Sequence, residues 1–473
     1  MIFSSYTFIF IFFPITFAGY KLFIRFAGVK AAKIWLVGAS LFFYAFGESK
    51  LSLLLMGTML FNYMIVSLMS KVEARSTFAK LLLAASLLEG LGLLFFFKYT
   101  NFFLDNINRI FGAELQPLNL MLPIGISFYT FQILSYVVDV YRGNSEKSSL
   151  LDFAVFVTFF PQLIVGPIIR HDEMVAQLTS EKFRGIDTKN IMLGMLLFSI
   201  GCAKKIILAD PLIAHAQNFY NVMGSGNFFE AWGGAISYTF AYYFDFSGYI
   251  DMALGLGLFF NIKLPVNFDS PYKARNFADF WRRWNITVSQ FFNDYIFDNI
   301  YHFGGRIGRL ILATLVTFIV SGIWHGAGWH FIFWGLANGI LVCLANIMTL
   351  KRKKLPLFLA WLMTFVGAIF VRVLFDSNSM SQAISVYKSL VDIRPLFRGT
   401  SEFLSAGFSY VTGNAGVVVI CIISAIICFF AKNTREISEN FEPKWYYAAA
   451  SGVLLAASLF FMGRVSSFLY FQF

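Results

Sequence analysis

The 473-residue chain has little charge and few of the side chains on which soluble enzymes depend. Asp, Glu, Lys and Arg make up 13% of the sequence, and there are five histidines and four cysteines. Soluble domains carry about 25% charged residues, so the composition excludes an ordinary soluble protein. The cysteines lie in apolar segments without a CxxC or other metal-ligand spacing, so we interpret them as packed thiols and predict no metal site.

The sequence also contains no Walker A, GxSxG, HExxH or paired-carboxylate motif. These motifs place the phosphate-binding loop, the nucleophilic serine, the zinc ligands or the acid–base pair of the corresponding enzymes. ATP-driven transport, serine-hydrolase chemistry and zinc-protease chemistry therefore have no motif support.

Long apolar runs are what the chain does have. Hydrophobic residues make up 58% of it, and several runs reach the roughly 20 residues that cross a bilayer as a helix. We predict an all-α polytopic membrane protein of about eleven spans. We expect its first span to be retained, because the N-terminus lacks the basic region and cleavage site of a signal peptide. We interpret the net charge of +11 as basic cytoplasmic loops and not as a nucleic-acid site.

The positions of Lys and Arg predict how the spans are oriented. Basic loops alternate with a nearly neutral loop between the first four apolar runs, and this pattern indicates an external N-terminus. The cluster Lys351–Lys354 is expected in the cytoplasm, and three later spans then leave the tail RVSSFLYFQF outside. The predicted spans with clear limits lie at about 3–20, 34–47, 52–69, 81–97, 357–375, 414–430 and 446–463.

Two central segments do not have the pattern of simple spans. Residues 151–174 contain Pro161, Gly166 and Pro167 in an apolar run, which favours a re-entrant or broken helix buried in protein. Residues 262–309 are polar and rich in Arg and Trp, and we expect a cytoplasmic amphipathic segment there.

Two histidines lie in the apolar segment SGIWHGAGWHFIFWG, residues 321–335. Ionisable groups at membrane depth are costly and are candidates for function. His325 is the stronger candidate, because an imidazole with a pKa of about 6.5 suits proton transfer at neutral pH. The alternative is a buried histidine hydrogen-bonded to a neighbouring helix. His330 would lie about 140° further round a continuous helix, and we interpret it as structural.

The segment DFWRRWNITVS places Arg282, Arg283 and Asn285 next to Trp281 and Trp284. Arginines at a cytoplasmic mouth suit a phosphate-bearing ligand, and the amide of Asn285 could stabilise an oxyanion. An interfacial helix with an aromatic belt and snorkelling arginines would give the same pattern.

Three further charged residues, Asp245, Asp251 and Arg372, interrupt apolar stretches. A charge in such a position is usually paired or functional. We interpret these three as partners in internal ion pairs.

Five segments resemble, in order and spacing, the membrane-bound O-acyltransferase family. They are LPIGISFYTFQILSYVVDVYRG, FFPQLIVGPIIRHDEM, FDFSGYIDMALGLGLFFNIKLPVNFDSPYKARNFADFWRRW, SGIWHGAGWHFIFWG and FVRVLF. The similarity is greatest to the bacterial branch that O-acetylates alginate and peptidoglycan, which is related to the teichoic-acid D-alanylation protein. It implies a single domain, 1–473, with N-terminal helices at 1–119, a core at 120–375 and C-terminal helices at 376–473. Its transmembrane helices would form a ring around a funnel, with re-entrant and amphipathic helices.

The resemblance also implies a site. His325 would be the catalytic histidine, and Trp281, Arg282, Arg283 and Trp284 would bind the donor, acetyl-CoA, from the cytoplasm, with no resident cofactor. Asn285 stands where many bacterial relatives have histidine, and it becomes a second polar group. The stretch DYIFDNIYHFGG departs from the DYLYIPLGG typical of the branch, which leaves the donor side less defined.

The ending FLYFQF resembles an aromatic C-terminal acyl-transfer motif of this family. Tyr470 would accept the acetyl group with His325 as its base, because a phenol with a pKa of about 10 is a poor nucleophile while protonated. The acetyl group would pass to a periplasmic O-acetyltransferase of the SGNH type that modifies a polysaccharide such as peptidoglycan or alginate. This implies a multi-pass protein of the bacterial inner membrane with a periplasmic C-terminus. Simple anchoring of the aromatics at the interface is the alternative.

Two other functions stay open from the sequence. One keeps the fold and transfers D-alanine from a carrier protein to teichoic acid. The other is a non-catalytic transporter of a small solute, with the histidines lining its path.

Overall fold

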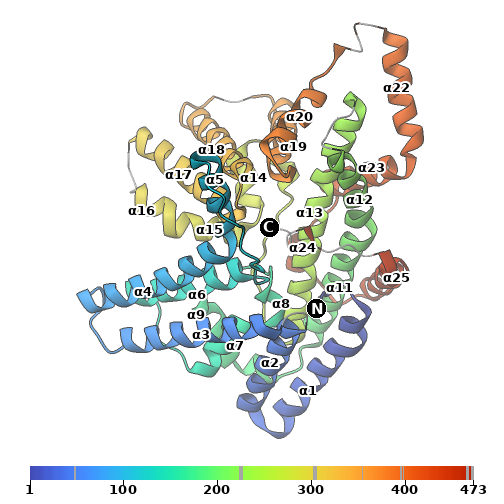
Figure 1. Cartoon of the computed structure of the whole chain (residues 1–473). Coiled ribbons are helices and arrows are strands. Elements are labelled where there is room, and N and C mark those ends of the chain that lie inside the picture. The colour runs from blue at the N-terminus through green and yellow to red at the C-terminus, as the bar shows by residue number, and fades with distance from the viewer. Residues whose placement is uncertain are drawn as a thin grey trace. The chain divides into compact units, whose positions relative to one another are not determined.

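The computed structural model describes residues 1–46, 49–222, 227–301, 306–353, 355–394, 397, 399–464 and 468–469. Over these ranges the chain forms helices and no strand, which confirms the all-α prediction (Figure 1). Eight helical segments are long and apolar enough to cross a membrane, or nine if the bent pair α22–α23 counts as one span. The protein is therefore a multi-pass membrane protein, while the predicted count of about eleven spans is not confirmed.

Contacts between the helices divide the chain into two compact units. The first unit consists of Met1–Cys202, Tyr249–Val266 and Phe441–Met462, and the second of Ala203–Gly248, Asn267–Asn440 and Gly463–Phe473. The two units alternate along the sequence. The predicted single domain with its three consecutive segments stays a prediction.

The first unit contains the N-terminal spans. Helix α1 packs on α2, α2 on α7, and α4 on α6. The fourth predicted span is longer than expected, because α4, a π-helical turn and α5 run on together from Thr77 to Phe111. The helices of this unit are α1 (Phe13–Phe26), α2 (Gly28–Ala45), α3 (Ser49–Met69), α4 (Thr77–Leu94), α5 (Thr100–Phe111), α6 (Ile126–Arg142), α7 (Leu150–Thr158), α8 (Phe160–Leu163), α9 (His171–Thr179), α10 (Glu181–Arg184), α11 (Thr188–Ala203) and α25 (Trp445–Phe461).

The broken helix predicted at 151–174 is confirmed. Helix α7 ends at Thr158 and α8 begins at Phe160 with Pro161 in its first turn, because proline has no N–H and its ring clashes with the preceding turn. The break leaves buried backbone groups that need partners. The side chains of Gln132 and Gln162 each donate to the carbonyl oxygen of Phe156 at 2.7 Å, and the N–H of Phe160 donates to a serine hydroxyl at 3.1 Å.

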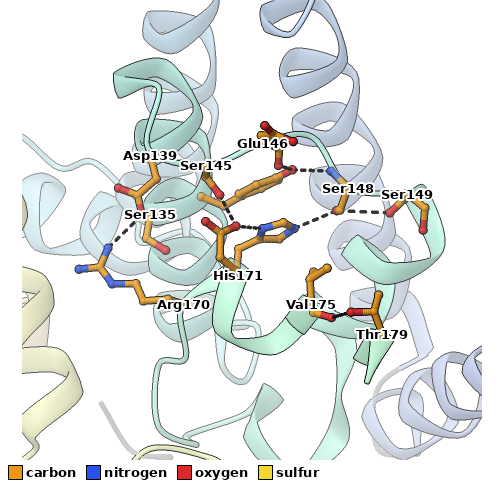
Figure 2. A network of polar contacts seen from close by, with 12 residues as sticks. Ser135, Asp139, Ser145, Glu146, Ser148, Ser149, Arg170, His171, Val175 and Thr179 are labelled. Atoms are coloured by element: carbon orange, nitrogen blue, oxygen red, sulfur yellow. Dashed lines mark hydrogen bonds and ion pairs between the residues drawn. The ribbon is translucent and has the colours of Figure 1, made fainter. Parts of the chain in front are cut away.

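A buried imidazole joins the loop after α6 to the start of α9 (Figure 2). The ring of His171 stacks on Tyr136 at 3.7 Å, and its two nitrogens lie 2.8 Å from Asp172 Oδ1 and from Ser148 Oγ. The Tyr136 hydroxyl donates to the carbonyl oxygen of Glu146 at 3.0 Å. Burial lowers the pKa of His171 despite the neighbouring Asp172 carboxylate, so the ring is neutral at pH 7 and acts as a clamp on this loop.

The second unit contains the remaining helices. Residues 267–301 of the polar stretch belong to it, and the helices there are short. Helix α17 packs closely on α18, and α18 packs on α14 and α19. The helices of this unit are α12 (Asp210–Asn221), α13 (Phe228–Phe259, which continues into the first unit), α14 (Phe277–Arg283), α15 (Ile286–Phe292), α16 (Asp298–Ile300), α17 (Ile307–His325), α18 (Trp329–Leu350), α19 (Leu357–Asp376), α20 (Met380–Leu390), α22 (Thr400–Gly413), α23 (Ala415–Phe430) and α24 (Thr434–Glu439).

Two glycines allow the close crossing of α17 and α18. A Cβ atom on Gly322 would lie 2.3 Å from the carbonyl oxygen of Phe331, and one on Gly335 would lie 2.3 Å from that of Phe318. Small residues let helix backbones approach in this way within membranes. The crossing lies one turn before the end of α17 and thereby positions His325.

Candidate active site

A cavity of about 360 Å³ lies within the second unit. Volumes of roughly 300 to 1,000 Å³ are usual for small-molecule sites. Side chains from α13, α14, α15, α17, α18 and α19 line it, and they include Tyr242, Trp281, Arg282, Trp284, Asn285, His325, Trp334, Arg372 and Phe375. The structure therefore brings together most of the residues predicted from the two separate motifs around 281–285 and 321–335.

His325 is the last residue of α17 and is 8% exposed. Its ring lies 4.6 Å from that of Trp324, 4.9 Å from Trp334 and 5.0 Å from Phe375, measured between centroids. These aromatic rings limit the orientations open to the imidazole and exclude bulk water from it, which are conditions that suit a general base.

His330 is separated from this site by the geometry of the turn. The helix does not continue past His325, because the backbone is extended at Gly326 and Gly328, and α18 begins at Trp329. His330 lies at the second position of α18, half-buried against Phe331, and is not among the described residues that line the cavity. This placement agrees with a structural role.

Asn285 is held in an uncommon backbone conformation. Helix α14 ends at Arg283, Trp284 is extended, and Asn285 adopts the left-handed conformation with φ 45° and ψ 55°. Hydrogen bonds hold the chain on both sides: Asp269 N–H donates to the Arg283 carbonyl, and Ile286 N–H donates to the Asn267 carbonyl, both at 3.0 Å. Such conformations persist where the surroundings fix them and are concentrated at functional sites.

The side chain of Asn267 completes this support. It is fully buried, and its Oδ1 accepts hydrogen bonds from the Thr287 N–H at 2.9 Å and the Thr287 hydroxyl at 2.7 Å. Because Thr287 follows Asn285 by two residues, these bonds fix the start of α15 and with it the direction of the Asn285 side chain. Asn267 was not among the residues predicted from the sequence.

The amide of Asn285 is available to a ligand. The residue is 3% exposed and lines the cavity, and its Oδ1 has no hydrogen-bond partner among the described residues. An unsatisfied buried polar atom costs about 1 to 3 kcal/mol, so it is expected to bind when the site is filled. Rotation of the amide by 180° exchanges Oδ1 with Nδ2, so the same side chain can present a donor.

The four residues predicted to bind the donor are placed differently from one another. Trp281, Arg282 and Trp284 line the cavity, with Arg282 exposed at its edge. Trp284 is buried in an aromatic cluster with Tyr242 and Phe280, so it is not part of an interfacial belt. Arg283 is not among the lining residues and pairs with Asp279 at 2.9 Å.

Arg372 and its partner form a buried ion pair beside the cavity. The guanidinium lies 2.7 Å from Asp376 Oδ1 and 3.2 Å from the centre of the Tyr242 ring. The prediction of an internal ion pair is confirmed for Arg372. Asp376, four residues further along α19, was not predicted. An aspartate at that spacing from an arginine on a helix indicates an ion pair, so the sequence could have identified it.

A second group of buried charges contains Asp245. Its carboxylate lies 2.6 Å from the Lys205 ammonium, which also lies 2.8 Å from Asp210. The ion-pair prediction is confirmed for Asp245, while Lys205 and Asp210 were missed although both flank an apolar run. Asp251 belongs to the first unit and is buried there. Tyr470 lies outside the described residues, so its role stays a prediction.

No group of three or more His, Cys, Asp or Glu side chains in a metal-binding arrangement occurs in the described part of the chain. The side chains that line the cavity offer an imidazole, a carboxamide and guanidinium groups.

Comparison with known proteins assigns the chain to a family. Residues 1–376 match the membrane-bound O-acyltransferase family, and the chain belongs to it. The predicted class of enzyme, an O-acyltransferase, is confirmed.

Three relatives indicate where the chain lies within this family. It is 37% identical to a peptidoglycan O-acetyltransferase of Helicobacter pylori over 100% of this chain and 98% of the relative. It is 33% identical to a probable alginate O-acetylase of Pseudomonas aeruginosa over 97% of this chain and 86% of the relative. A teichoic acid D-alanyltransferase of Streptococcus thermophilus is 29% identical over 49% of this chain and 58% of the relative.

Proposed function

We propose that the protein transfers an acetyl group from acetyl-CoA, bound from the cytoplasm, to a hydroxyl acceptor on the outer side of the bacterial inner membrane. The acetyl group is destined for a polysaccharide of the cell envelope. The main support for the proposal is that His325 and Asn285 line the same cavity. The amide oxygen of Asn285 lacks a hydrogen-bond partner there among the described residues.

The proposed reaction uses each group for one task. His325 accepts the proton of the acceptor hydroxyl as its oxygen attacks the thioester carbonyl carbon. The Asn285 amide donates a hydrogen bond to the oxyanion that forms, which is where an aligned donor lowers the barrier most. The carbon–sulfur bond then breaks, and the proton on His325 passes to the departing CoA thiolate. Arg282, exposed at the cavity edge, is suited to a phosphate of the donor.

O-acetylation is favoured over D-alanyl transfer by the extent of similarity. The relatives named for peptidoglycan and alginate O-acetylation match nearly the whole chain, whereas the D-alanyltransferase matches about half of it. Membership in a family of acyltransferases favours both enzymatic alternatives over a transporter.

The first acceptor in this proposal is Tyr470, near the end of the chain. Positive charge in the loops predicts that this tail is periplasmic, and an acetyl ester on its phenol would pass to a periplasmic O-acetyltransferase of the SGNH type. Radiolabelled acetyl-CoA incubated with the purified protein should label the chain, and Tyr470→Phe should abolish the label. Labelling that survives in Tyr470→Phe would place the acceptor elsewhere.

The catalytic histidine is tested by a matched pair of variants. His325→Ala should abolish acetylation of envelope polysaccharide while the amount of protein in the membrane stays unchanged. His330→Ala, in the same segment but outside the cavity lining, should retain acetylation. Normal acetyl levels in cells whose sole copy carries His325→Ala would rule out His325 as the base.

A further inference from the structure

Three charged side chains, none of which lines the cavity, are buried together in the second unit. Lys205 is 0% exposed, and its ammonium contacts the carboxylates of Asp210 at 2.8 Å and Asp245 at 2.6 Å. Replacing such a buried ionic group by apolar side chains is often neutral or stabilising. A contribution to folding stability therefore does not by itself explain why these three charged residues are present.

The local backbone is built to bring two of these side chains together. Residues Lys204–Ala209 form a π-helical stretch between α11 and α12, and the N–H of Asp210 bonds to the carbonyl of Lys205. This i to i+5 hydrogen bond is the mark of a π-bulge, a feature frequent at functional sites. It places Lys205 and Asp210, five residues apart, on one face, where an ordinary α-helix would separate them by about 140°.

The described residues of the C-terminal tail bind directly to this group. Phe468 and Leu469 are 2% and 1% exposed. The N–H of Leu469 donates to Asp245 Oδ2 at 2.9 Å, and the Lys205 ammonium lies 4.6 Å from the centre of the Phe468 ring. A hydrogen bond to a carboxylate is stronger than one between neutral groups, and a cation–π contact is stronger when it is shielded from water.

We propose that Lys205, Asp210 and Asp245 form a docking site for the chain's own C-terminal tail. Asp245 binds the backbone of the tail, Lys205 binds its aromatic side chain, and Asp210 holds Lys205 in place. Tyr470 directly follows the anchored Leu469, so the site fixes the point from which the phenol extends. The docking stands by itself, whereas its use in presenting Tyr470 for acylation rests on the proposed function.

The docking is tested by binding, without any acyl donor. The protein is truncated after Gly463, purified in detergent, and titrated with a fluorescent peptide of the tail sequence RVSSFLYFQF. Asp245→Asn should weaken peptide binding by about ten- to a hundredfold, the usual worth of a hydrogen bond to a charged group. A peptide with N-methylleucine at position 469, which lacks the donating N–H, should bind the truncated parent protein as weakly.

Asp376→Asn is the matched control, because it neutralises another buried carboxylate of the same unit whose ion-pair partner is Arg372 and not Lys205. It should bind the peptide like the truncated parent. Equal affinity of the truncated parent and Asp245→Asn, or no peptide binding by monodisperse truncated protein, would overturn the proposal.

The full-length protein gives a second measurement that does not require the truncation to fold. Carboxypeptidase should remove the tail residues at least tenfold faster from Asp245→Asn than from the parent, and at the parental rate from Asp376→Asn. Equal trimming of Asp245→Asn and parent would also count against docking. If docking holds but Tyr470 is never acylated, the proposed acyl relay fails and the docking site stands.

Discussion

At the residue scale, Asn285 has both a left-handed backbone conformation and an amide that faces the cavity, and a single substitution can remove the amide alone. Its left-handed conformation is held by hydrogen bonds on either side, and its amide faces the cavity with an unpartnered oxygen among the described residues. Glycine adopts positive φ without a steric penalty. Asn285→Gly therefore removes the amide while it keeps the backbone, which Asn285→Ala would not do.

We expect Asn285→Gly to lower kcat by about 10² to 10³, the effect of removing one oxyanion donor, with little change in the thermal unfolding temperature. Acetyl transfer from acetyl-CoA and unfolding in detergent are the two measurements. A full reaction rate in the glycine variant would show that the amide takes no part in catalysis.

At the element scale, the crossing of α17 and α18 sets the position of His325. The backbone of α18 passes so close to Gly322 that a Cβ there would meet the Phe331 carbonyl oxygen at 2.3 Å, and neither group can rotate away. A larger residue must therefore push the helices apart, one turn before the imidazole of His325. Gly308, near the other end of α17, has no heavy atom within 4 Å of its would-be Cβ.

This contrast defines a prediction with an internal control. Gly322→Ala should cost about 1 to 3 kcal/mol of stability through overpacking and reduce acetyl transfer by about 10²-fold through misplacement of His325. Gly308→Ala should leave activity intact and gain up to about 1 kcal/mol from helix propensity. Equal behaviour of the two variants in thermal unfolding and activity would contradict this account of the crossing.

The clamp at α9 makes part of the stability depend on pH. Burial lowers the pKa of His171 in the folded protein from its ordinary value of 6.5, so below pH 6.5 the unfolded chain binds a proton that the folded chain does not. Stability is then lost as the pH falls, with a slope of at most about 1.4 kcal/mol per pH unit. At neutral pH the group has no such effect.

His171→Gln removes the titrating group and retains a polar side chain. The unfolding temperature of the parent should fall more steeply than that of His171→Gln between pH 7 and pH 5, since all other titrating groups are common to both proteins. Parallel curves over this range would show that the imidazole is not the group responsible.

At the scale of the whole molecule, the charges in the loops predict which ends of the spans face the cytoplasm. The span α19 separates the basic turn that contains Lys351 from helix α20, which contains Lys388, and both lysines are exposed. The positive-inside rule places Lys351 in the cytoplasm and Lys388 outside. The same orientation puts the tail of the chain on the outer side, as the acyl relay requires.

A membrane-impermeant maleimide should label Lys388→Cys in intact cells and Lys351→Cys only after the membrane is opened. Of the four native cysteines, three are buried and one is partly buried, so their background labelling should be low. The reverse pattern would invert the topology and place the tail in the cytoplasm.

The sequence by itself determined the all-α membrane class, the break near Pro161 and both motifs of the site. Each depends on local composition: apolar runs long enough to cross a bilayer, a proline that ends a helix, and costly polar residues in apolar surroundings. The resemblance of five segments to a known family gave the class of enzyme, which the comparisons confirm.

Only the tertiary structure decided which distant residues meet. Lys205 and Asp245 are 40 residues apart, and Asp245 and Leu469 are 224 apart, so no local pattern relates them. The support of Asn285 by Asn267 and the exclusion of His330 from the cavity likewise depend on a backbone bridge and a turn. The packing of the helices determines which side chains pair across the fold, and that packing depends on many weak contacts at once. The pattern along the chain indicates only which buried polar residues need a partner.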